Sequence, residues 1–256
     1  CSAWPWSWVC YITSEMKGVI TAGGLGTRLR PLTLATNKHL LPVYDQPMVF
    51  YPIQTLVKAG ITEVMVTVGG PQAGHFVSVL KNGDNLGLTH LEYAYQEGEG
   101  GIPAAIALAE KFAADGSICV ILGDNTTDAD ISSAVRNFNG GSVAFFKEVP
   151  DPERYGVPVF DQKDKTKVIR IEEKPKKPKS NYASTGLYIF DNKCFDFIRN
   201  CKPSARGELE IPDVQNQYID RGELKWEMLD GFWTDAGKFE TLFAANAYWA
   251  KKKGVF

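Results

Sequence analysis

Apolar runs and helical patterns alternate along the first half of the chain, and this alternation limits the folds available to it. Runs rich in β-branched residues at 17–22, 63–68, 91–95 and 118–122 predict strands. Between them, helical spacing of apolar residues predicts helices at 48–59, 74–80 and 102–112. Strands that alternate with helices favour a mostly parallel sheet with helices on both faces, so the expected class is α/β.

The second half of the chain has more strands and fewer helices. Strands are expected at 143–146, 157–160, 168–172 and 182–190, and helices at 193–200, 212–221 and 238–252. We find no internal repeat and no low-complexity linker. Residues 16–256 are therefore expected to form a single domain.

Residues 1–15 do not continue this pattern. Three tryptophans and a proline lie within the first eight positions, and no basic stretch precedes an apolar run, so a secretory signal is not expected. Met16 and Lys17 have the character of a natural start. We expect residues 1–15 to be an upstream or cloning-derived extension outside the fold.

Composition excludes several functional classes. The 256 residues carry a formal net charge of −2, which argues against a broad nucleic-acid or membrane surface. No apolar run is long enough to span a bilayer. The five cysteines show no Cys-x-x-Cys spacing and there are only three histidines, so neither a zinc site nor a disulfide framework is expected. Reduced thiols favour a cytoplasmic location.

A glycine-rich segment directly after the first expected strand has the composition of a phosphate-binding loop. Its sequence at 23–31 is GGLGTRLRP, and Lys38 follows shortly after it. Glycines let backbone N–H groups approach an anion closely, and guanidinium and ammonium groups add positive charge. The segment matches neither a P-loop nor a dinucleotide fingerprint, because Leu29 stands three residues after Gly26. The alternative is a glycine-rich turn beside solvated arginines.

Asp124 follows the apolar run 118–122 within the sequence Gly-Asp-Asn. A carboxylate at the carboxyl end of a parallel strand faces the crevice where ligands bind, and Mg²⁺ prefers one or two carboxylates together with phosphate oxygens. The alternative is an ordinary β-turn aspartate.

The glycine-rich segment, with the later sequence NKHLLPV at 37–43, resembles the signature of sugar-1-phosphate nucleotidylyltransferases. The likeness runs from about Met16 to about Gly254 and is strongest to members that use dTTP and glucose 1-phosphate. It implies a Rossmann-like nucleotidyltransferase fold with a mixed, mostly parallel central sheet flanked by helices. It also implies a nucleotide-binding half at about 16–140 and a sugar-binding half at about 141–256. Longer members carry further segments after the position of Gly254, so we expect the short form.

The resemblance implies roles for residues in both halves. A second metal ligand, Asp235, lies in the sequence FWTDAG, although an N-cap of the following helix is the alternative reading. Gln96 and Gly101 are expected at the base, although Glu99, Ile102 and Pro103 depart from the family pattern. The expected nucleotide-binding residues are Gly23, Gly24, Gly26, Thr27, Arg28, Gln96 and Gly101; the expected sugar-phosphate-binding residues are Gly156, Glu173, Lys174 and Thr185; the expected catalytic residues are Arg28, Lys38, Asp124 and Lys174; and the expected metal ligands are Asp124 and Asp235.

The implied reaction is nucleotidyl transfer from dTTP to glucose 1-phosphate with Mg²⁺ as cofactor, giving dTDP-glucose and pyrophosphate. UTP is an alternative donor, because uracil lacks only the methyl group of thymine. A nucleotide-sugar sensor without catalysis is the alternative outside the enzymes, since a fold does not fix an activity. Expected partners are these small molecules, without nucleic acid or membrane, and a homo-oligomer is possible.

Overall fold

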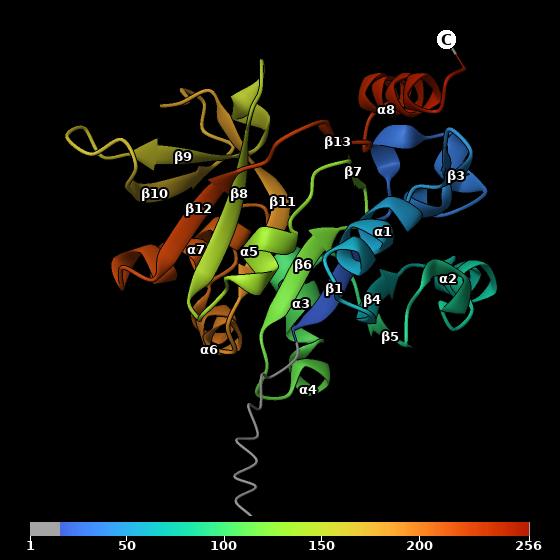
Figure 1. Ribbon diagram of the computed structural model, residues 1–256, viewed down its shortest axis with the longest axis horizontal. Coiled ribbons are helices and arrows are strands. Elements are labelled where there is room, and N and C mark those ends of the chain that lie inside the picture. The colour runs from blue at the N-terminus through green and yellow to red at the C-terminus, as the bar shows by residue number, and fades with distance from the viewer. Residues whose placement is uncertain (1–15, 256) are drawn as a thin grey trace, which may run out of the picture.

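The computed structural model describes residues 16–255, and a seven-stranded sheet forms its centre (Figure 1). The expectation for residues 1–15 lies outside the described residues. The sheet order is β12-β8-β11-β6-β1-β4-β5. Its strands are β1 (Lys17–Ala22), β4 (Glu63–Gly69), β5 (His90–Gln96), β6 (Ile118–Leu122), β8 (Ser142–Glu148), β11 (Tyr182–Phe190) and β12 (Leu224–Met228).

The sheet is mixed but mostly parallel, which confirms the expected fold class. β1 pairs in parallel with β4 and β6, β4 with β5, and β8 with β12. Among the seven strands of this sheet, β11 alone runs against its neighbours, and it lies between β6 and β8. The carboxyl ends of the parallel strands therefore meet at one edge, where ligands bind in open α/β sheets.

Three smaller strand pairs lie outside the main sheet. β2 (Pro42–Val43) pairs with β3 (Gln46–Pro47), and β9 (Gly156–Phe160) pairs with β10 (Val168–Glu173). The third joins β7 (Asn125–Thr127) to β13 (Trp233–Asp235), more than a hundred residues later in the chain. Figure 1 shows this pair between the edge of the main sheet and the last helix.

Helices cover both faces of the sheet. The helices are α1 (Phe50–Lys58), α2 (Ala73–Leu80), α3 (Ile102–Ala107), α4 (Glu110–Ala113), α5 (Ser132–Arg136), α6 (Lys193–Asn200), α7 (Ile211–Asp220) and α8 (Phe239–Lys252). Side chains of α1, α2 and α5 pack into one core, and those of α3, α4, α6 and α7 pack into another. Consecutive strand residues divide between the two cores, as Val120 and Ile121 do, because side chains alternate across a sheet. No helix among the described residues combines the length and the apolar character needed to cross a membrane.

The structure departs from the expected elements in several places, and it adds β2, β3 and α5, which were not expected. The helix expected at 102–112 is divided into α3 and α4, because the amide of Ala109 donates to the carbonyl of Ile106 and tightens the chain there. β12 is an edge strand with exposed Lys225 and Glu227, so its sequence lacks the apolar signal of a central strand. β7 and β13 have three residues each, too few for a periodic pattern.

Replacing Ile121 with Ala should lower the free energy of unfolding by about 2–5 kcal/mol, because it leaves a cavity beneath the central strand β6. Ile121 is 1% exposed. Ile169→Ala is the matched control, since Ile169 in β10 is 44% exposed and its loss should cost less than about 1 kcal/mol. Urea unfolding measures both variants, and equal losses would contradict this assignment of the core.

Candidate active site

A cavity of about 770 Å³ opens at the carboxyl edge of the parallel strands. Polar and apolar atoms share its walls about equally, and both halves of the chain contribute to them. The lining residues come from 21–28, 38–39, 96–105, 122–125, 153–156, 173–174, 184–188, 206–211 and 233–238. Every residue that the sequence analysis assigned to a site lies on this cavity, so the fold gathers them in one place.

The glycine-rich loop leaves β1 and forms the wall of the cavity near Lys38. Gly26 has a left-handed backbone (φ 65°), and its carbonyl accepts a hydrogen bond from Thr33 Oγ1 at 2.9 Å. A Cβ on Gly26 would lie 2.8 Å from Cβ of Lys38, closer than real contacts allow. Thr27 opens a short 3₁₀ turn whose Leu29 is fully buried. The turn is anchored while Gly23, Gly24, Thr27 and Arg28 stay at the cavity.

Lys38 and Asp124 form a nearly buried ion pair. Lys38 Nζ lies 2.6 Å from Asp124 Oδ2, and the two side chains are 12% and 11% exposed. Burial alone would raise the pKa of Asp124, but the adjacent ammonium group outweighs it and holds that pKa well below its usual range. Burial and the charge of Lys38 together lower the pKa of His39 to about 3, so its imidazole is neutral.

Asp235 is brought beside Asp124 by backbone pairing. In the ladder between β13 and β7, Asp235 lies opposite Asn125, and the amide of Ala236 donates to the carbonyl of Asp124 at 2.8 Å. Burial, followed by the charge of Asp124, raises the pKa of Asp235 to about 6. A Cβ placed on Gly237 would lie 3.3 Å from both Arg28 Nη2 and Asp124 Oδ2. The absence of a side chain at Gly237 therefore leaves room between the guanidinium group of Arg28 and the carboxylate of Asp124.

Gln96 ends β5 and lies against the glycine-rich loop. Residues 97–101, which follow it, are called the base-side loop after the role expected for Gln96 and Gly101. The Nε2 of Gln96 donates to the carbonyl of Gly101 at 3.3 Å, and its Oε1 occupies the space that a Cβ on Gly23 would take. Gly101 has φ 86° and forms a parallel bridge with Leu209, whose amide donates to the carbonyl of Gly100 at 3.0 Å. The base-side loop is thus bonded to the loop before α7.

On the opposite side, Glu173 ends β10 and Lys174 follows it. Lys174 Nζ lies 2.7 Å from Glu173 Oε1, and Arg206 Nη2 lies 3.2 Å from the same oxygen. Gly156 lies opposite Glu173 in the ladder between β9 and β10. The buried hydroxyl of Thr185 donates to the carbonyl of Phe145 at 3.0 Å, so its side chain stabilises β11 against β8.

Comparison with known proteins shows the family of this chain. The family model described as nucleotidyl transferase matches residues 17–252. The chain belongs to the nucleotidyl transferase family. The glucose-1-phosphate thymidylyltransferase of Neisseria gonorrhoeae is 42% identical over 240 residues, which cover 91% of this chain and 82% of that protein. Its counterpart in Xanthomonas campestris strain B100 is 42% identical over 238 residues, covering 91% and 80%.

Solved structures of nucleotidyl transferases share the fold. A crystal structure described as a glucose-1-phosphate thymidylyltransferase of Bacillus anthracis, in complex with sucrose, has a TM-score of 0.86 and 45% identity, covering 91% of this chain and 95% of that one. A UDP-glucose pyrophosphorylase with bound UDP-glucose has a TM-score of 0.81 at 23% identity, covering 93% of this chain and 100% of that one. At 23% identity, the similarity to the UDP-glucose pyrophosphorylase shows only a shared fold.

Nucleotidyl transferases generally use a divalent metal, and the adjacent carboxylates of Asp124 and Asp235 fit one. Burial first, and then the negative charge of Asp124, raise the pKa of Asp235, and a cation between the two carboxylates would offset both effects. Among residues 16–255 there is no cluster of three or more His, Cys, Asp or Glu side chains that could hold a metal. Phosphate oxygens and water would therefore supply the remaining ligands, as they commonly do for Mg²⁺.

Sequence reasoning missed several contacts within this site. Arg154 Nη2 lies 3.5 Å from Asp235 Oδ1, and the hydroxyl of Tyr155 donates to the same oxygen at 3.3 Å. Trp233 Nε1 donates to Asn125 Oδ1 at 2.5 Å. These contacts join residues 80 or more positions apart in the chain. No local pattern carries a signal for them.

Gly101→Ala should weaken the hydrogen bond between the Leu209 amide and the carbonyl of Gly100, because the added Cβ would overlap the carbonyl of Leu209. Hydrogen exchange at the Leu209 amide should accelerate by roughly 10-fold, as expected for the loss of one hydrogen bond. Gly98→Ala is the matched control, since Gly98 also has a positive φ (67°) but has no atom within 4 Å of the added Cβ. Equal acceleration in both variants would show that backbone strain alone causes the effect.

Proposed function

We propose that the chain transfers the thymidylyl group from dTTP to glucose 1-phosphate, giving dTDP-glucose and pyrophosphate. The names of relatives at about 40% identity support this reaction, since they cover 91% of the chain. The observation that carries the proposal is the arrangement of charge in the cavity. The acidic pair has Arg28 and Lys38 beside it on the side of the glycine-rich loop, and the cavity wall that follows β10 carries Lys174.

The reaction needs little covalent chemistry from the protein. An oxygen of the sugar phosphate attacks the α-phosphorus of dTTP in line, that P–O bond forms, and the bond to pyrophosphate breaks. The nucleophile is already anionic, so no general base is required. The contribution of the protein is to position two anions and to offset their charge.

Lys38 and Arg28 would bind the triphosphate. An ammonium group has three N–H donors, so Lys38 can keep its bond to Asp124 while it donates to a phosphate oxygen. Arg28 would contact the transferring and leaving phosphates, and the backbone of Gly23, Gly24, Gly26 and Thr27 would approach them closely. We propose Mg²⁺ as the metal at Asp124 and Asp235, where it would neutralise phosphate charge.

Gln96 and Gly101 would recognise the base, because a side-chain amide can both donate to and accept from the edge of a pyrimidine. Lys174 would hold the sugar phosphate, while Glu173, Gly156 and Thr185 would lie along the sugar. In this proposal residues 16–140 form the nucleotide half and residues 141–256 the sugar half. We place the protein in the cytoplasm because its cysteines show no disulfide framework.

Pyrophosphate release with dTTP and glucose 1-phosphate tests the proposal directly. We expect release that depends on both substrates and on Mg²⁺. UTP remains the alternative donor, since one methyl contact is worth only about 1 kcal/mol. A larger kcat/KM with UTP than with dTTP would make UTP the preferred donor. Tight nucleotide binding without turnover on any sugar phosphate would instead favour the sensor.

Asp124→Asn and Asp235→Asn should each lower kcat by about 100-fold or more, because each removes an anionic group from the proposed metal site. The double variant should raise the activation free energy by much less than the sum of the two single increases, since the same site is lost in each case. Initial rates across a Mg²⁺ titration measure all three variants. Fully additive effects would separate the two aspartates and return Asp235 to the role of a helix cap.

A further inference from the structure

We propose that Arg154 is a positioning residue for Asp235: it fixes one carboxylate oxygen so that the other faces Asp124, and its charge weakens the pull of the acidic pair on a free cation. The inference deepens the proposed function, on which it rests, and concerns the same site. Arg154 lies in the half that the sequence analysis assigned to the sugar.

Arg154 is itself held in place by its own turn. It ends the 3₁₀ turn Pro152–Arg154, and its Nη1 donates to Asp151 in that turn. The amide of Tyr155 donates to the carbonyl of Pro152 at 3.0 Å, and the carbonyl of Tyr155 accepts from the amide of Lys174 at 2.9 Å. The guanidinium group is therefore presented by a fixed piece of backbone, and only 22% of the side chain is exposed.

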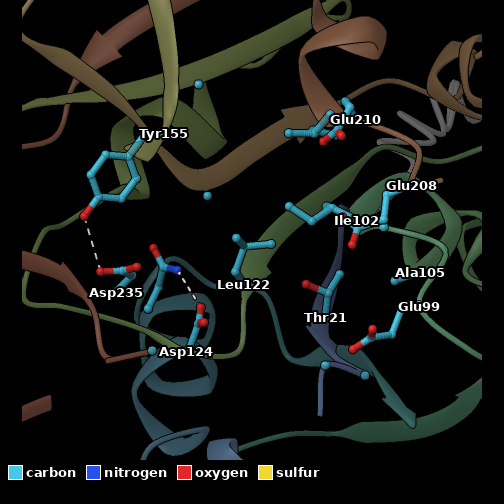
Figure 2. Close-up of a pocket in the computed structure, with 18 of the residues that line it drawn as sticks. Thr21, Glu99, Ile102, Ala105, Leu122, Asp124, Tyr155, Glu208, Glu210 and Asp235 are labelled. Atoms are coloured by element: carbon cyan, nitrogen blue, oxygen red, sulfur yellow. Dashed lines mark hydrogen bonds between the residues drawn. The ribbon is translucent and has the colours of Figure 1, made fainter. Parts of the chain in front are cut away.

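Arg154 and Tyr155 converge on the same oxygen of Asp235. The guanidinium Nη2 lies 3.5 Å from Oδ1, and the hydroxyl of Tyr155 donates to Oδ1 at 3.3 Å. Figure 2 shows the ring of Tyr155 reaching Asp235 from above, while the second oxygen of Asp235 lies on the side of Asp124. The two donors therefore fix the carboxylate and leave its second oxygen for the centre of the cavity.

Charge and position are separable in this arrangement. The positive charge of Arg154 offsets part of the negative charge of the two aspartates, so a free divalent cation is attracted less strongly. The ion pair with Arg154 and the hydrogen bond from Tyr155 fix the direction of the carboxylate, which affects the rate more than the affinity. Tyr155 supplies only the second effect, because its hydroxyl is neutral. This difference allows each contribution to be measured.

The experiment compares Arg154→Met, Arg154→Lys and Tyr155→Phe with Arg170→Met. Arg170 is exposed on β10, so its replacement removes one positive charge from the same hairpin without touching the cavity. For each protein, kcat and both KM values are measured with dTTP and glucose 1-phosphate. Binding of Mn²⁺ in the absence of nucleotide is measured by electron paramagnetic resonance, which does not depend on activity.

Arg154→Met should lower kcat by about 10- to 100-fold, as expected for a misplaced group at a reacting centre. It should also tighten Mn²⁺ binding by roughly 2- to 10-fold, because a nearby positive charge is lost. Tyr155→Phe should lower kcat by about 3- to 10-fold, the value of one hydrogen bond, with Mn²⁺ affinity unchanged. Arg154→Lys should keep Mn²⁺ affinity near that of the wild type, and Arg170→Met should change neither quantity.

Opposite changes in rate and cation affinity distinguish positioning from general damage, since a destabilised fold would not bind Mn²⁺ more tightly. Unchanged or weaker Mn²⁺ binding by Arg154→Met, or kcat within twofold of the wild type, would overturn the proposal. If Arg154→Met does not fold, as judged by circular dichroism, Arg154→Lys and Tyr155→Phe carry the test. Absence of pyrophosphate release by the wild type would defeat the proposed function, whereas the Mn²⁺ measurements would still test the placement of Arg154.

Discussion

The site depends on two carboxylates that backbone pairing holds near each other. Asp124 and Asp235 repel, and burial makes that repulsion stronger because there is little water to screen it. The ladder between β7 and β13 and the bond from Ala236 to the carbonyl of Asp124 fix the pair regardless of charge. A cation offsets the negative charge of each carboxylate: Lys38 pairs with Asp124, and Arg154 pairs with Asp235. Backbone pairing thus holds the two carboxylates near each other, and the neighbouring cations offset their repulsion.

The reversed strand β11 connects this centre to the opposite wall of the cavity. It lies between β6 and β8, and its register shifts between Ser184 and Tyr188. Gly186, within that shift, has φ 76°, and a Cβ there would lie 2.6 Å from Cδ1 of Leu122. The irregular part of β11 therefore packs directly against the end of β6, just before Asp124. A displacement of this wall would therefore also displace Asp124, because closely packed groups transmit strain.

The sequence predicted the elements whose signal is local and missed the contacts whose signal is not. β6 and β11 have the expected bounds because each is an apolar run of strand length, and α6 has them because its apolar residues recur at helical spacing. The glycine-rich loop, Lys38 and the two aspartates could be named from motifs and their place after strands. β12 could not be recognised, because an edge strand is polar on its open side. The contact from Arg154 to Asp235 arises only when 80 intervening residues fold, so no spacing reveals it.

The bridge between Gly101 and Leu209 joins the base-side loop to the loop before α7 through main-chain atoms. These loops form one continuous rim, although the sequence separates them by about a hundred residues. Arg206 lies in the second loop and contacts both Glu173 and Glu210, so the rim extends to the side of the cavity that holds Lys174. Replacing the base-side loop in this scaffold would therefore disturb the opposite wall unless the partner loop were replaced with it. With base and sugar bound on these two walls as proposed, the bases and sugars that the scaffold accepts would change together rather than independently.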